Sequence, residues 1–291
     1  MKNWLKHIKA LFAKEAKPSS APTPLEDKQE ELVEKEVAPL SPEEKEQAEQ
    51  YEQIKQMINS EDDSNQQLAL MFLQSLGFPL DENLFKTISG SVHKLSFWIE
   101  HAPEEMLAPY KRLELRHGFF KQYQDIFKFA EVLPHFTSLE ELDWRIGPYW
   151  NQYPLVRSAA KLPNLKIMHL KDCRMHYLPD NIGEAKNLVE LNLFLNKLKE
   201  LPDSFSNLTN LKRLNLADNE FRRFPKLLYY MDNLKSLDIH ANPLQDISAK
   251  HFADLKGLKE LRLPKKIAHY YKEVLQSSMP NVDFSTYYWE F

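Results

Sequence analysis

The stretch LVELNLFLNKLKELPDSFSNLTN, residues 188–210, is followed directly by a second stretch with the same layout, LKRLNLADNEFRRFPKLLYYMDN, residues 211–233. In this layout apolar residues occupy positions 1, 4, 6 and 11, and Asn or Cys occupies position 9. Units of this kind begin 23, 23, 23 and 24 residues apart, at Leu165, Leu188, Leu211, Leu234 and Leu258. Self-similarity at a fixed period predicts a repeat architecture, in which each unit buries its apolar residues against its neighbours.

Each unit combines a short strand with a turn. Leu191 and Leu193 alternate with other residues, which indicates a strand with one buried face. The Asn at position 9 would turn the chain and hydrogen-bond the backbone, so stacked copies should form a ladder. Three units then carry a proline, at Pro179, Pro202 and Pro225, which would prevent further strand pairing and start the return on the other side.

The pattern L-x-x-L-x-L-x-x-[N/C]-x-L resembles that of leucine-rich repeat proteins over at least residues 139–284. The resemblance implies an α/β fold: a solenoid with a curved parallel sheet on its concave side and short helical or extended returns on its convex side. The return, LPxx(L/F/I)xxLxxL, resembles that of cytoplasmic phosphatase-regulator and Ras-pathway scaffolds. By analogy alone, this resemblance implies a scaffold or adaptor.

Composition along the chain predicts six segments. They are an amphipathic basic helix (1–17), a disordered Pro- and Glu-rich linker (18–41), a helical hairpin cap (42–90), irregular N-terminal repeats (91–164), regular repeats (165–264), and a C-terminal cap helix with an edge strand (265–291). The hairpin helices are expected to begin at Ser41-Pro42-Glu43-Glu44 and Ser64-Asn65-Gln66-Gln67. A separate docking module is the alternative for this hairpin.

Finer expectations concern the two flanks of the regular repeats. Residues 92–97, 110–115 and 139–144 look like strands, 119–133 like a helix, and 146–155 like a loop. At the other end, 265–278 is expected to be one helix and 279–284 a closing strand.

The first seventeen residues carry apolar side chains at helical spacing, with lysines mostly on the other side. These features predict contact with a membrane surface through Trp4, Leu5, Ile8, Leu11 and Phe12. The alternative is a helix that docks on its own protein or a frayed terminus. Charged residues interrupt the apolar run, so a secretory signal is not expected.

Bulk properties exclude several classes of function. A formal net charge of −4 gives no sign of the basic surface that nucleic-acid binding needs. The sequence contains no Gly-rich phosphate loop, so we expect no cofactor. One cysteine, Cys173, excludes an internal disulfide and fits a reducing compartment, so we expect a cytoplasmic monomer. Cys173 occupies position 9 of its unit, where its side chain should face the core. The side chains of the nearby His169 and His176 should point away from it, so we expect no metal site. No motif for nucleophilic catalysis occurs, so we expect no enzyme.

Binding is the function that the residue pattern favours. Positions 3, 5, 7 and 8 of each unit should project from the concave face without packing duties, and they supply His169, Lys171, Glu190, Asn192, Phe194, Leu195, Arg213, Asn215, Asp238 and His240. Phe194 and Leu195 form an apolar pair among polar neighbours, which predicts a hot spot for a protein partner. The alternative is that Phe194 packs on the adjacent strand.

A second candidate surface is an aromatic loop at the rim of the sheet, with Tyr149, Trp150 and Tyr153. The sequence therefore predicts a non-enzymatic protein–protein interaction module that uses the concave face. Two alternatives stay open: a peripheral membrane recruiter anchored by residues 1–17, and an enzyme that acts through the groove or the N-terminal region.

Overall fold

A computed structural model describes residues 41–76, 80–116, 119–120, 123–145, 151–245 and 254–284. The chain divides into two compact units, residues 1–56 and 57–291. The predicted basic helix 1–17 and nearly all of the predicted linker lie outside the described residues. In the first unit, helix α2 (Pro42–Asn59) begins as expected: the Glu44 N–H donates to Ser41 Oγ (3.2 Å), and the Ser41 N–H donates to a Glu44 carboxylate oxygen (2.9 Å).

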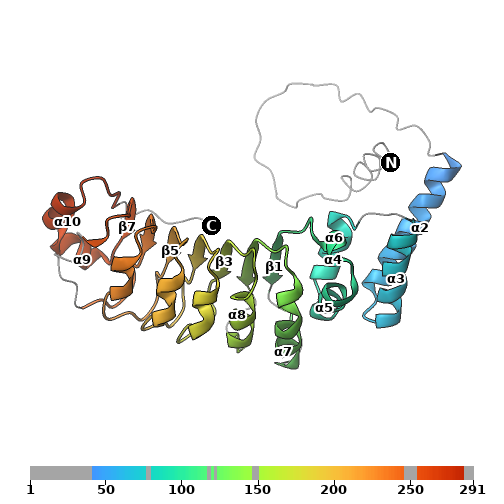
Figure 1. Cartoon of the computed structure of the whole chain (residues 1–291), viewed down its shortest axis with the longest axis horizontal. Coiled ribbons are helices and arrows are strands. Elements are labelled where there is room, and N and C mark those ends of the chain that lie inside the picture. The colour runs from blue at the N-terminus through green and yellow to red at the C-terminus, as the bar shows by residue number, and fades with distance from the viewer. Residues whose placement is uncertain are drawn as a thin grey trace, which may run out of the picture. The chain divides into compact units, whose positions relative to one another are not determined.

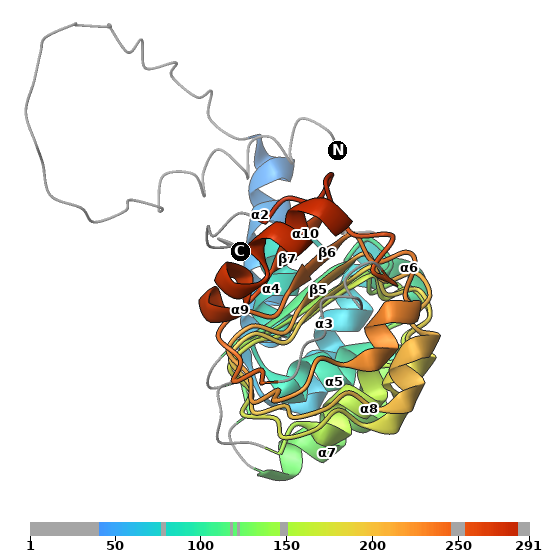
Figure 2. The same ribbon diagram turned by 90° about the vertical axis from the view of Figure 1, so that its left-hand side faces the viewer.

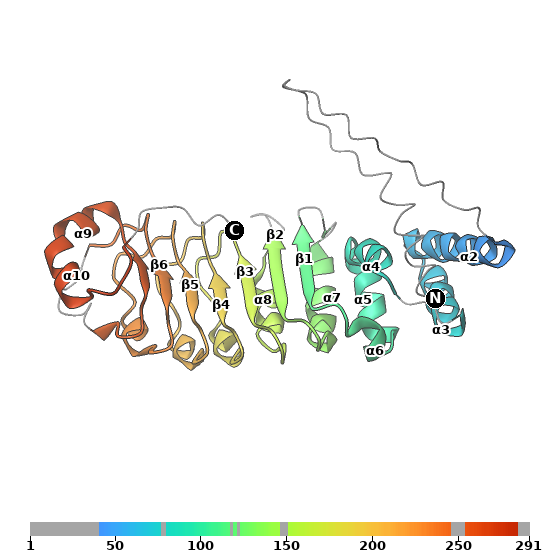
Figure 3. The same cartoon turned by 90° about the horizontal axis from the view of Figure 1, so that it is seen from above.

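In the described part of the second unit, seven parallel strands form one sheet, in chain order (Figures 1 and 3). They are β1 (Arg112–Arg116), β2 (Glu141–Arg145), β3 (Ile167–Leu170), β4 (Glu190–Asn192), β5 (Arg213–Asn215), β6 (Ser236–Asp238) and β7 (Glu260–Arg262). The register pairs position 4 of each unit with position 4 of the next, for example Met168 with Leu191 and Leu191 with Leu214. All three side chains are buried, so the repeat period places one apolar row under the sheet.

The returns between strands lie against one face of the sheet (Figure 2). The two longer returns form α7 (Tyr123–Val132) with η1 (Leu133–His135), and α8 (Tyr153–Ala159). The regular returns form the 3-10 helices η2 (Asp180–Glu184), η3 (Asp203–Asn207) and η4 (Lys226–Tyr230). Each 3-10 helix begins directly after Pro179, Pro202 or Pro225, whose fixed φ suits the start of a helical turn. The predicted solenoid architecture is confirmed.

The predicted asparagine ladder is present at position 9, in Asn196, Asn219 and Asn242. The Asn219 amide nitrogen donates to the carbonyls of Leu193 (2.9 Å) in the preceding unit and Leu216 (3.0 Å) in its own. The Asn219 amide oxygen accepts from the Leu198 N–H (3.0 Å). Because each amide bonds two units, this buried side chain fixes both the turn and the stacking of the repeat.

A left-handed residue precedes each position 9. Asp172, Leu195, Asp218 and Ala241 occupy position 8 and have φ values of 51°, 58°, 52° and 52°. This conformation reverses the chain so that the next side chain points into the turn. Asp tolerates it comparatively well, whereas a larger apolar residue such as Leu195 is strained there.

The N-terminal cap contains more helix than predicted. It comprises α3 (Asp63–Leu76), α4 (Glu82–Ser89), α5 (Val92–His101) and α6 (Glu104–Leu107). The strand predicted at 92–97 is therefore wrong: it is part of α5. Residues 94–99 are all buried, including Lys94, whose amine donates to the Asn59 carbonyl (2.9 Å). A segment buried on all sides shows neither helical nor strand periodicity, so the pattern was uninformative there.

Three smaller expectations also differ from the structure. Helix α3 is capped by Asp62, whose carboxylate accepts from the N–H groups of Ser64 (2.7 Å) and Asn65 (3.3 Å), rather than by Ser64. The predicted loop 146–155 ends earlier than expected, because Tyr153 already belongs to α8. The predicted helix 265–278 is broken at Tyr271 into α9 (Lys265–Tyr270) and α10 (Lys272–Ser278).

The closing strand is reduced to one bridge beside β7. Asp283 pairs in parallel with Glu260; its N–H donates to the Lys259 carbonyl (2.7 Å), and its carbonyl accepts from the Leu261 N–H (2.9 Å). The last described residue, Phe284, follows directly. Among the helices in the described ranges, none is long and apolar enough to cross a membrane.

The ladder leads to a stability prediction. Asn219→Ala should lower the free energy of unfolding by about 2–4 kcal/mol, because it leaves buried backbone groups of two units without partners. As a matched control, Asn210→Ala removes one bond at the exposed sheet edge, to the Lys186 carbonyl (2.9 Å), and should cost about 1 kcal/mol or less. Urea denaturation followed by circular dichroism measures both. Equal losses for the two variants would contradict the ladder's role.

Candidate functional site

The face of the sheet opposite the returns carries the predicted binding residues. We call this the concave face and define it by positions 3, 5 and 7 of each unit, with position 8 at its rim. Six of the predicted residues lie in strands: His169, Glu190, Asn192, Arg213, Asn215 and Asp238. Four lie just past the strand ends: Lys171, Phe194, Leu195 and His240. The fold therefore brings all ten predicted residues to one side of the sheet and its rim.

A charged cluster crosses β3, β4 and β5. Glu190 lies between His169, whose Nε2 is 3.0 Å from Oε1, and Arg213, whose Nε donates to Oε2 (2.5 Å). Burial alone raises the pKa of Glu190, but the hydrogen bonds and charges of His169 and Arg213 outweigh it and hold this pKa below its ordinary value. The carboxylate is therefore ionised and fully engaged by its neighbours.

A second cluster lies on β6 and β7. Asp238 Oδ1 is 2.6 Å from His240 Nδ1 and also accepts from the His240 N–H (3.2 Å). Asp238 Oδ2 is 3.6 Å from an Arg262 guanidinium nitrogen. Both carboxylate oxygens therefore have cationic or donor neighbours, which restrain the side chains of Asp238, His240 and Arg262.

Three of the predicted residues are less accessible than the sequence suggested. Glu190, Asn192 and Asp238 are exposed by only 6%, 1% and 2%. These three side chains are therefore not free of packing, contrary to the expectation, and ion pairs engage two of them, Glu190 and Asp238. Arg213 remains exposed, and His169, Lys171, Phe194, Asn215 and His240 are partly exposed.

Asn192 has an unsatisfied polar group on this face. Its amide oxygen accepts from the Phe194 N–H (3.0 Å), as the Asn215 oxygen does from the Ala217 N–H (2.9 Å). Its amide nitrogen is buried and makes no hydrogen bond to the described residues. Leaving such a donor without an acceptor costs about 1–3 kcal/mol. The amide of Asn192 is therefore an unused hydrogen-bond donor on the concave face.

The apolar pair on the rim is only partly packed. Phe194 is partly buried, while Leu195 is 44% exposed in its left-handed backbone conformation. An exposed, strained leucine beside a phenylalanine and among charged clusters differs from the neighbouring units, which carry Asp172, Asp218 and Ala241 at the same position. Leu195 is thus a large apolar side chain at the rim that is open to a partner.

The second predicted surface is described only in part. Tyr149 and Trp150 lie outside the described residues. Tyr153 begins α8, stacks on Tyr177 with ring centroids 4.1 Å apart, and accepts a hydrogen bond from the His176 N–H (3.2 Å). These contacts give Tyr153 a packing role where α8 meets the turn after β3.

The chemistry of single side chains favours structure over catalysis. Burial raises the pKa of the Cys173 thiol to about 12, so the thiol stays protonated in its turn. The backbone N–H of Cys173 donates to the Asn196 side chain (3.2 Å), as its position-9 slot requires. Within the described ranges, no group of three or more His, Cys, Asp or Glu side chains could hold a metal ion.

Sequence reasoning missed a second row of asparagines, which lies just before the strands, at their N-terminal ends. Asn164, Asn187, Asn210 and Asn233 each donate to a backbone carbonyl of the preceding unit, at 2.7–2.9 Å. The signal was available, because these residues recur 23 apart, directly before the leucine that opens each unit.

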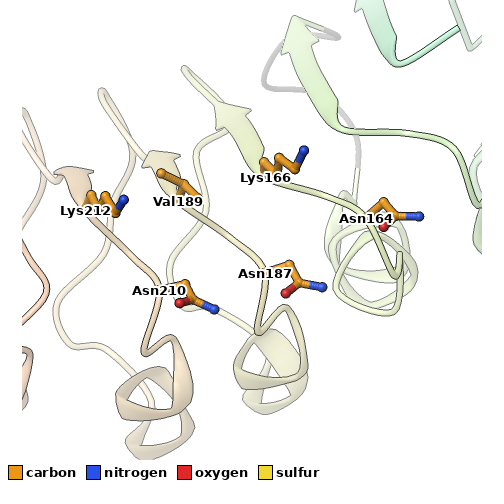
Figure 4. A pocket seen from close by; sticks show the side chains of 6 residues that line it. All are labelled: Asn164, Lys166, Asn187, Val189, Asn210 and Lys212. Carbon is orange, nitrogen blue, oxygen red and sulfur yellow. The ribbon is translucent and has the colours of Figure 1, made fainter.

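An open hollow of about 350 Å³ lies beside this row. It is lined by Asn164, Asn187, Asn210, Lys166, Val189 and Lys212 (Figure 4). Lys166 is held by Glu140 (2.5 Å), which also pairs with Lys111 (2.6 Å); these bonds lower the pKa of Glu140 to about 2. The asparagine donors are committed to the backbone. Packing of the units therefore accounts for this hollow, and we assign it no ligand.

A one-sided repeat solenoid with an internal asparagine ladder is the class of protein that this fold defines. A model of the leucine-rich repeat region family matches residues 123–281, more than half of the chain. The chain belongs to the leucine-rich repeat family. Proteins of this family are generally binding modules for other proteins, and are generally non-enzymatic. None of the curated proteins matches the chain.

Several solved structures are similar to the chain. A leucine-rich repeat protein of Leptospira interrogans has 24% identity and a TM-score of 0.45, over 63% of this chain and 50% of that one. The TLR13–ssRNA13 complex has 22% identity and a TM-score of 0.46, over 57% and 24%. An internalin (inlF) of Listeria monocytogenes has 17% identity and a TM-score of 0.41, over 60% and 54%. The chain thus spans about half of two of these chains and a quarter of the third.

The charged cluster on β3–β5 leads to a pH prediction. Glu190→Gln should lower the free energy of unfolding at pH 7 by about 1.5–3 kcal/mol, because it removes the charge that His169 and Arg213 engage. The folded-state pKa of Glu190 lies below the unfolded value of about 4.3, so this stabilisation is complete above that value and is lost as the pH falls through the folded one. The deficit of the variant should therefore shrink below about pH 4 in urea titrations.

The control for that experiment is Glu140→Gln, which breaks exposed ion pairs with Lys111 and Lys166. Its effect should disappear in 1 M NaCl, where the screening length is about 3 Å, while the effect of Glu190→Gln should persist. A Glu190→Gln deficit that is the same at pH 3 and pH 7 would contradict the assigned charge state.

Proposed function

We propose that the protein is a non-enzymatic scaffold or adaptor that binds a protein partner on the concave face and its rim. The observation that carries the proposal is that Leu195 is exposed and has a left-handed backbone conformation, on a face whose charged side chains form ion pairs. Family membership supports the general class of function. The choice of this face and of its anchor residues is our own inference.

Leu195 combines the left-handed conformation shared by position 8 of the four regular units with a large, exposed apolar side chain. A left-handed conformation costs an L-amino acid roughly 1–2 kcal/mol, and glycine, asparagine and aspartate are the residues that adopt it most readily. Strained residues of this kind cluster at binding and catalytic sites, where another selective advantage offsets the loss of stability. An exposed apolar side chain at such a position contributes nothing evident to the fold, so a role in binding explains it.

The surroundings of Leu195 have the layout of a protein interface. Phe194 adds partly exposed aromatic surface beside it, and the same face carries the polar side chains of Arg213, Lys171 and His240. A small apolar centre within a polar rim is the usual arrangement of binding hot spots, and aromatic and arginine side chains are enriched in them. The ion pairs of Glu190 and Asp238 hold the polar groups in fixed positions, which lowers the entropy cost of binding.

A cytoplasmic location and a monomeric state belong to the same proposal. The location is supported by Cys173, a lone buried cysteine without a disulfide partner, and by the lack of cysteine-rich caps in the sequence.

The second candidate function is membrane recruitment by the amphipathic basic stretch 1–17, for which its apolar and lysine pattern is the motivating observation. Replacing Leu5, Ile8 and Leu11 by Ser should abolish sedimentation of the full chain with vesicles that contain anionic phosphatidylserine. Replacing Leu25, Val33 and Val37 by Ser is the matched control and should leave sedimentation unchanged. Equal sedimentation of both variants would end this candidate.

The main proposal predicts opposite effects on stability and on binding at one residue. Leu195→Gly should raise the free energy of unfolding by up to about 1 kcal/mol, because it relieves the left-handed strain. It should also weaken partner capture about 30-fold, the loss expected for a hot-spot side chain of about 2 kcal/mol. Affinity capture from cell extract with quantitative mass spectrometry, followed by titration of the captured partner, measures the second effect.

Ala241→Gly is the matched control, because Ala241 occupies the same position two repeat units away and has nearly the same φ. This variant should gain stability without loss of partner. Tyr230→Ala, which removes a large side chain that is 83% exposed on the convex side, should also keep every partner. Undiminished capture by Leu195→Gly would refute the role given to this face.

A further inference from the structure

Helix α3 has apolar residues on two opposite sides, and only one of these sides is covered. Its inner side carries the buried residues Gln66, Ala69, Leu70 and Leu73. Its outer side carries Leu68, Met71, Phe72 and Leu76, which are exposed by 42%, 54%, 42% and 42%. We call these four residues the α3 stripe, because their spacing of i, i+3, i+4 and i+8 places them together along one side of the helix.

Buried hydrogen bonds fix the direction in which the stripe faces. The Gln66 amide nitrogen donates to the carbonyls of Ile58 (3.1 Å) and Ser60 (2.5 Å), and its amide oxygen accepts from Trp98 Nε1 (2.8 Å). Turning α3 about its axis would leave these buried polar groups without partners, at a cost of about 1–3 kcal/mol each. The α3 stripe therefore faces outward as a consequence of the fold.

The composition of α3 is that of an interface rather than of a solvated helix. Residues 64–76 contain no charged side chain, whereas the preceding helix α2 has seven in 18 residues. Depletion of charge and enrichment in Phe and Met are typical of the centres of protein interfaces. The stripe offers on the order of 350 Å² of apolar surface, within the range of the largest and often functional patches on monomeric proteins.

The shape of this surface fits a helix. The stripe follows about 12 Å of the axis of α3, at 1.5 Å per residue, and Leu68, Phe72 and Leu76 form one i, i+4 ridge. Such a ridge packs into the groove between the ridges of a second helix. An extended peptide would instead need the open edge of a sheet for its backbone hydrogen bonds, which α3 does not offer.

The charges next to the stripe indicate a basic partner. Glu61, Asp62 and Asp63 directly precede the stripe and are exposed; one Asp63 oxygen lies 3.0 Å from His93 Nε2, with the Asp63 side chain still 63% exposed. This acidic end attracts lysine or arginine. It repels an anionic membrane surface, and residues 61–76 contain no Lys or Arg with which to bind one.

A second copy of the chain fits less well than another protein. Two copies that pack stripe to stripe would bury roughly 700 Å², short of the 1,200 Å² or more of a stable interface. Each copy would also bring an acidic end without a basic counterpart. A partner helix of the same length gains the attraction of its own cations and can bind in the micromolar range, as a recruiting contact.

We propose that the α3 stripe binds an amphipathic helix of another protein, with apolar residues at i, i+3, i+4 and i+7 and with lysine or arginine at the end that lies over residues 61–63. Helices α4 and α5 lie between α3 and the first strand, so this surface is separate from the concave face (Figures 1 and 3). A scaffold with both surfaces can hold two partners at once, which goes beyond the function proposed above.

The test uses the full chain and fluorescein-labelled model peptides of about 18 residues, or roughly 27 Å of helix. The first has leucine at positions 1, 4, 5, 8, 11, 12 and 15, lysine at positions 16–18, and alanine or glutamine elsewhere. The second has glutamate in place of lysine, and the third has the leucines spread around the helix. Fluorescence anisotropy should show micromolar binding of the first peptide, at least fivefold weaker binding of the second, and no binding of the third.

Paired substitutions locate the site. The double variant Leu68→Gln/Phe72→Gln should lower affinity for the first peptide at least tenfold. The matched control, Tyr230→Gln/Val274→Gln, removes two exposed apolar side chains elsewhere and should leave affinity unchanged. All four side chains are exposed, so circular dichroism melts should show both variants to be folded. Equal affinity of the two double variants, or equal binding of the three peptides, would overturn the inference.

Three further results would assign the stripe to another occupant and so overturn the inference. The first is a dimer in sedimentation velocity that Leu68→Gln/Phe72→Gln abolishes. The second is co-sedimentation with phosphatidylserine vesicles that the same variant abolishes. The third is at least tenfold tighter peptide binding when Leu5, Ile8 and Leu11 are replaced by Ser, which would place the start of the chain on the stripe.

The two binding surfaces are tested separately. Leu195→Gly should leave binding of the first peptide unchanged, because Leu195 lies on the rim of the concave face. Loss of the captured partner by Leu195→Gly alone supports the concave face, whatever the peptides do. Loss of peptide binding by Leu68→Gln/Phe72→Gln alone supports the α3 stripe, whatever happens to that partner.

Discussion

The fold depends on the asparagine amide at position 9. Apolar residues at 23-residue spacing would collapse in many ways, but a buried amide accepts only an arrangement that satisfies its donors and acceptor. In Asn196, Asn219 and Asn242 that arrangement connects a turn to the preceding unit through the same pair of contacts. To point this amide inward, the residue at position 8 must adopt the less stable left-handed conformation.

That constraint also creates the candidate binding surface. Because the amides fix the stacking, positions 3, 5 and 7 of successive strands form regular rows, and charges of opposite sign meet across strands. The row His169, Glu190 and Arg213 results from this register rather than from any property of one unit. Such cross-strand clusters are rigid, so the rim residues Phe194 and Leu195 are displayed on a fixed base, as a preorganised interface requires.

The sequence predicted the parts of the molecule that repeat. The period identified the strands from Leu142 onward, the ladder and the proline-initiated returns, because each is repeated and its evidence adds up. It did not predict features that occur once. Residues 94–99 of helix α5 are all buried and so have no informative period, and no residue pattern marks the break at Tyr271.

The sequence predicted which residues lie on the candidate site, but not how exposed their side chains are. Alternation along a strand assigns Asn192 and Asp238 to the concave face, but it does not reveal that both side chains are almost fully buried. Whether Glu190 is free or ion-paired depends on residues 21 and 23 positions away, which only the register brings together. The edge asparagines could have been found, since Asn187 and Asn210 obey the same period as the leucines.

The central claim is that the concave face and its rim bind the partner. Hydrogen–deuterium exchange of the full chain, with and without a captured partner, tests it most directly. The account predicts that the partner slows exchange in residues 190–195 and 213–218, while the convex 3-10 helices Asp203–Asn207 and Lys226–Tyr230 are unchanged. Protection confined to those convex helices or to α3, with no change in residues 190–195, would contradict the account.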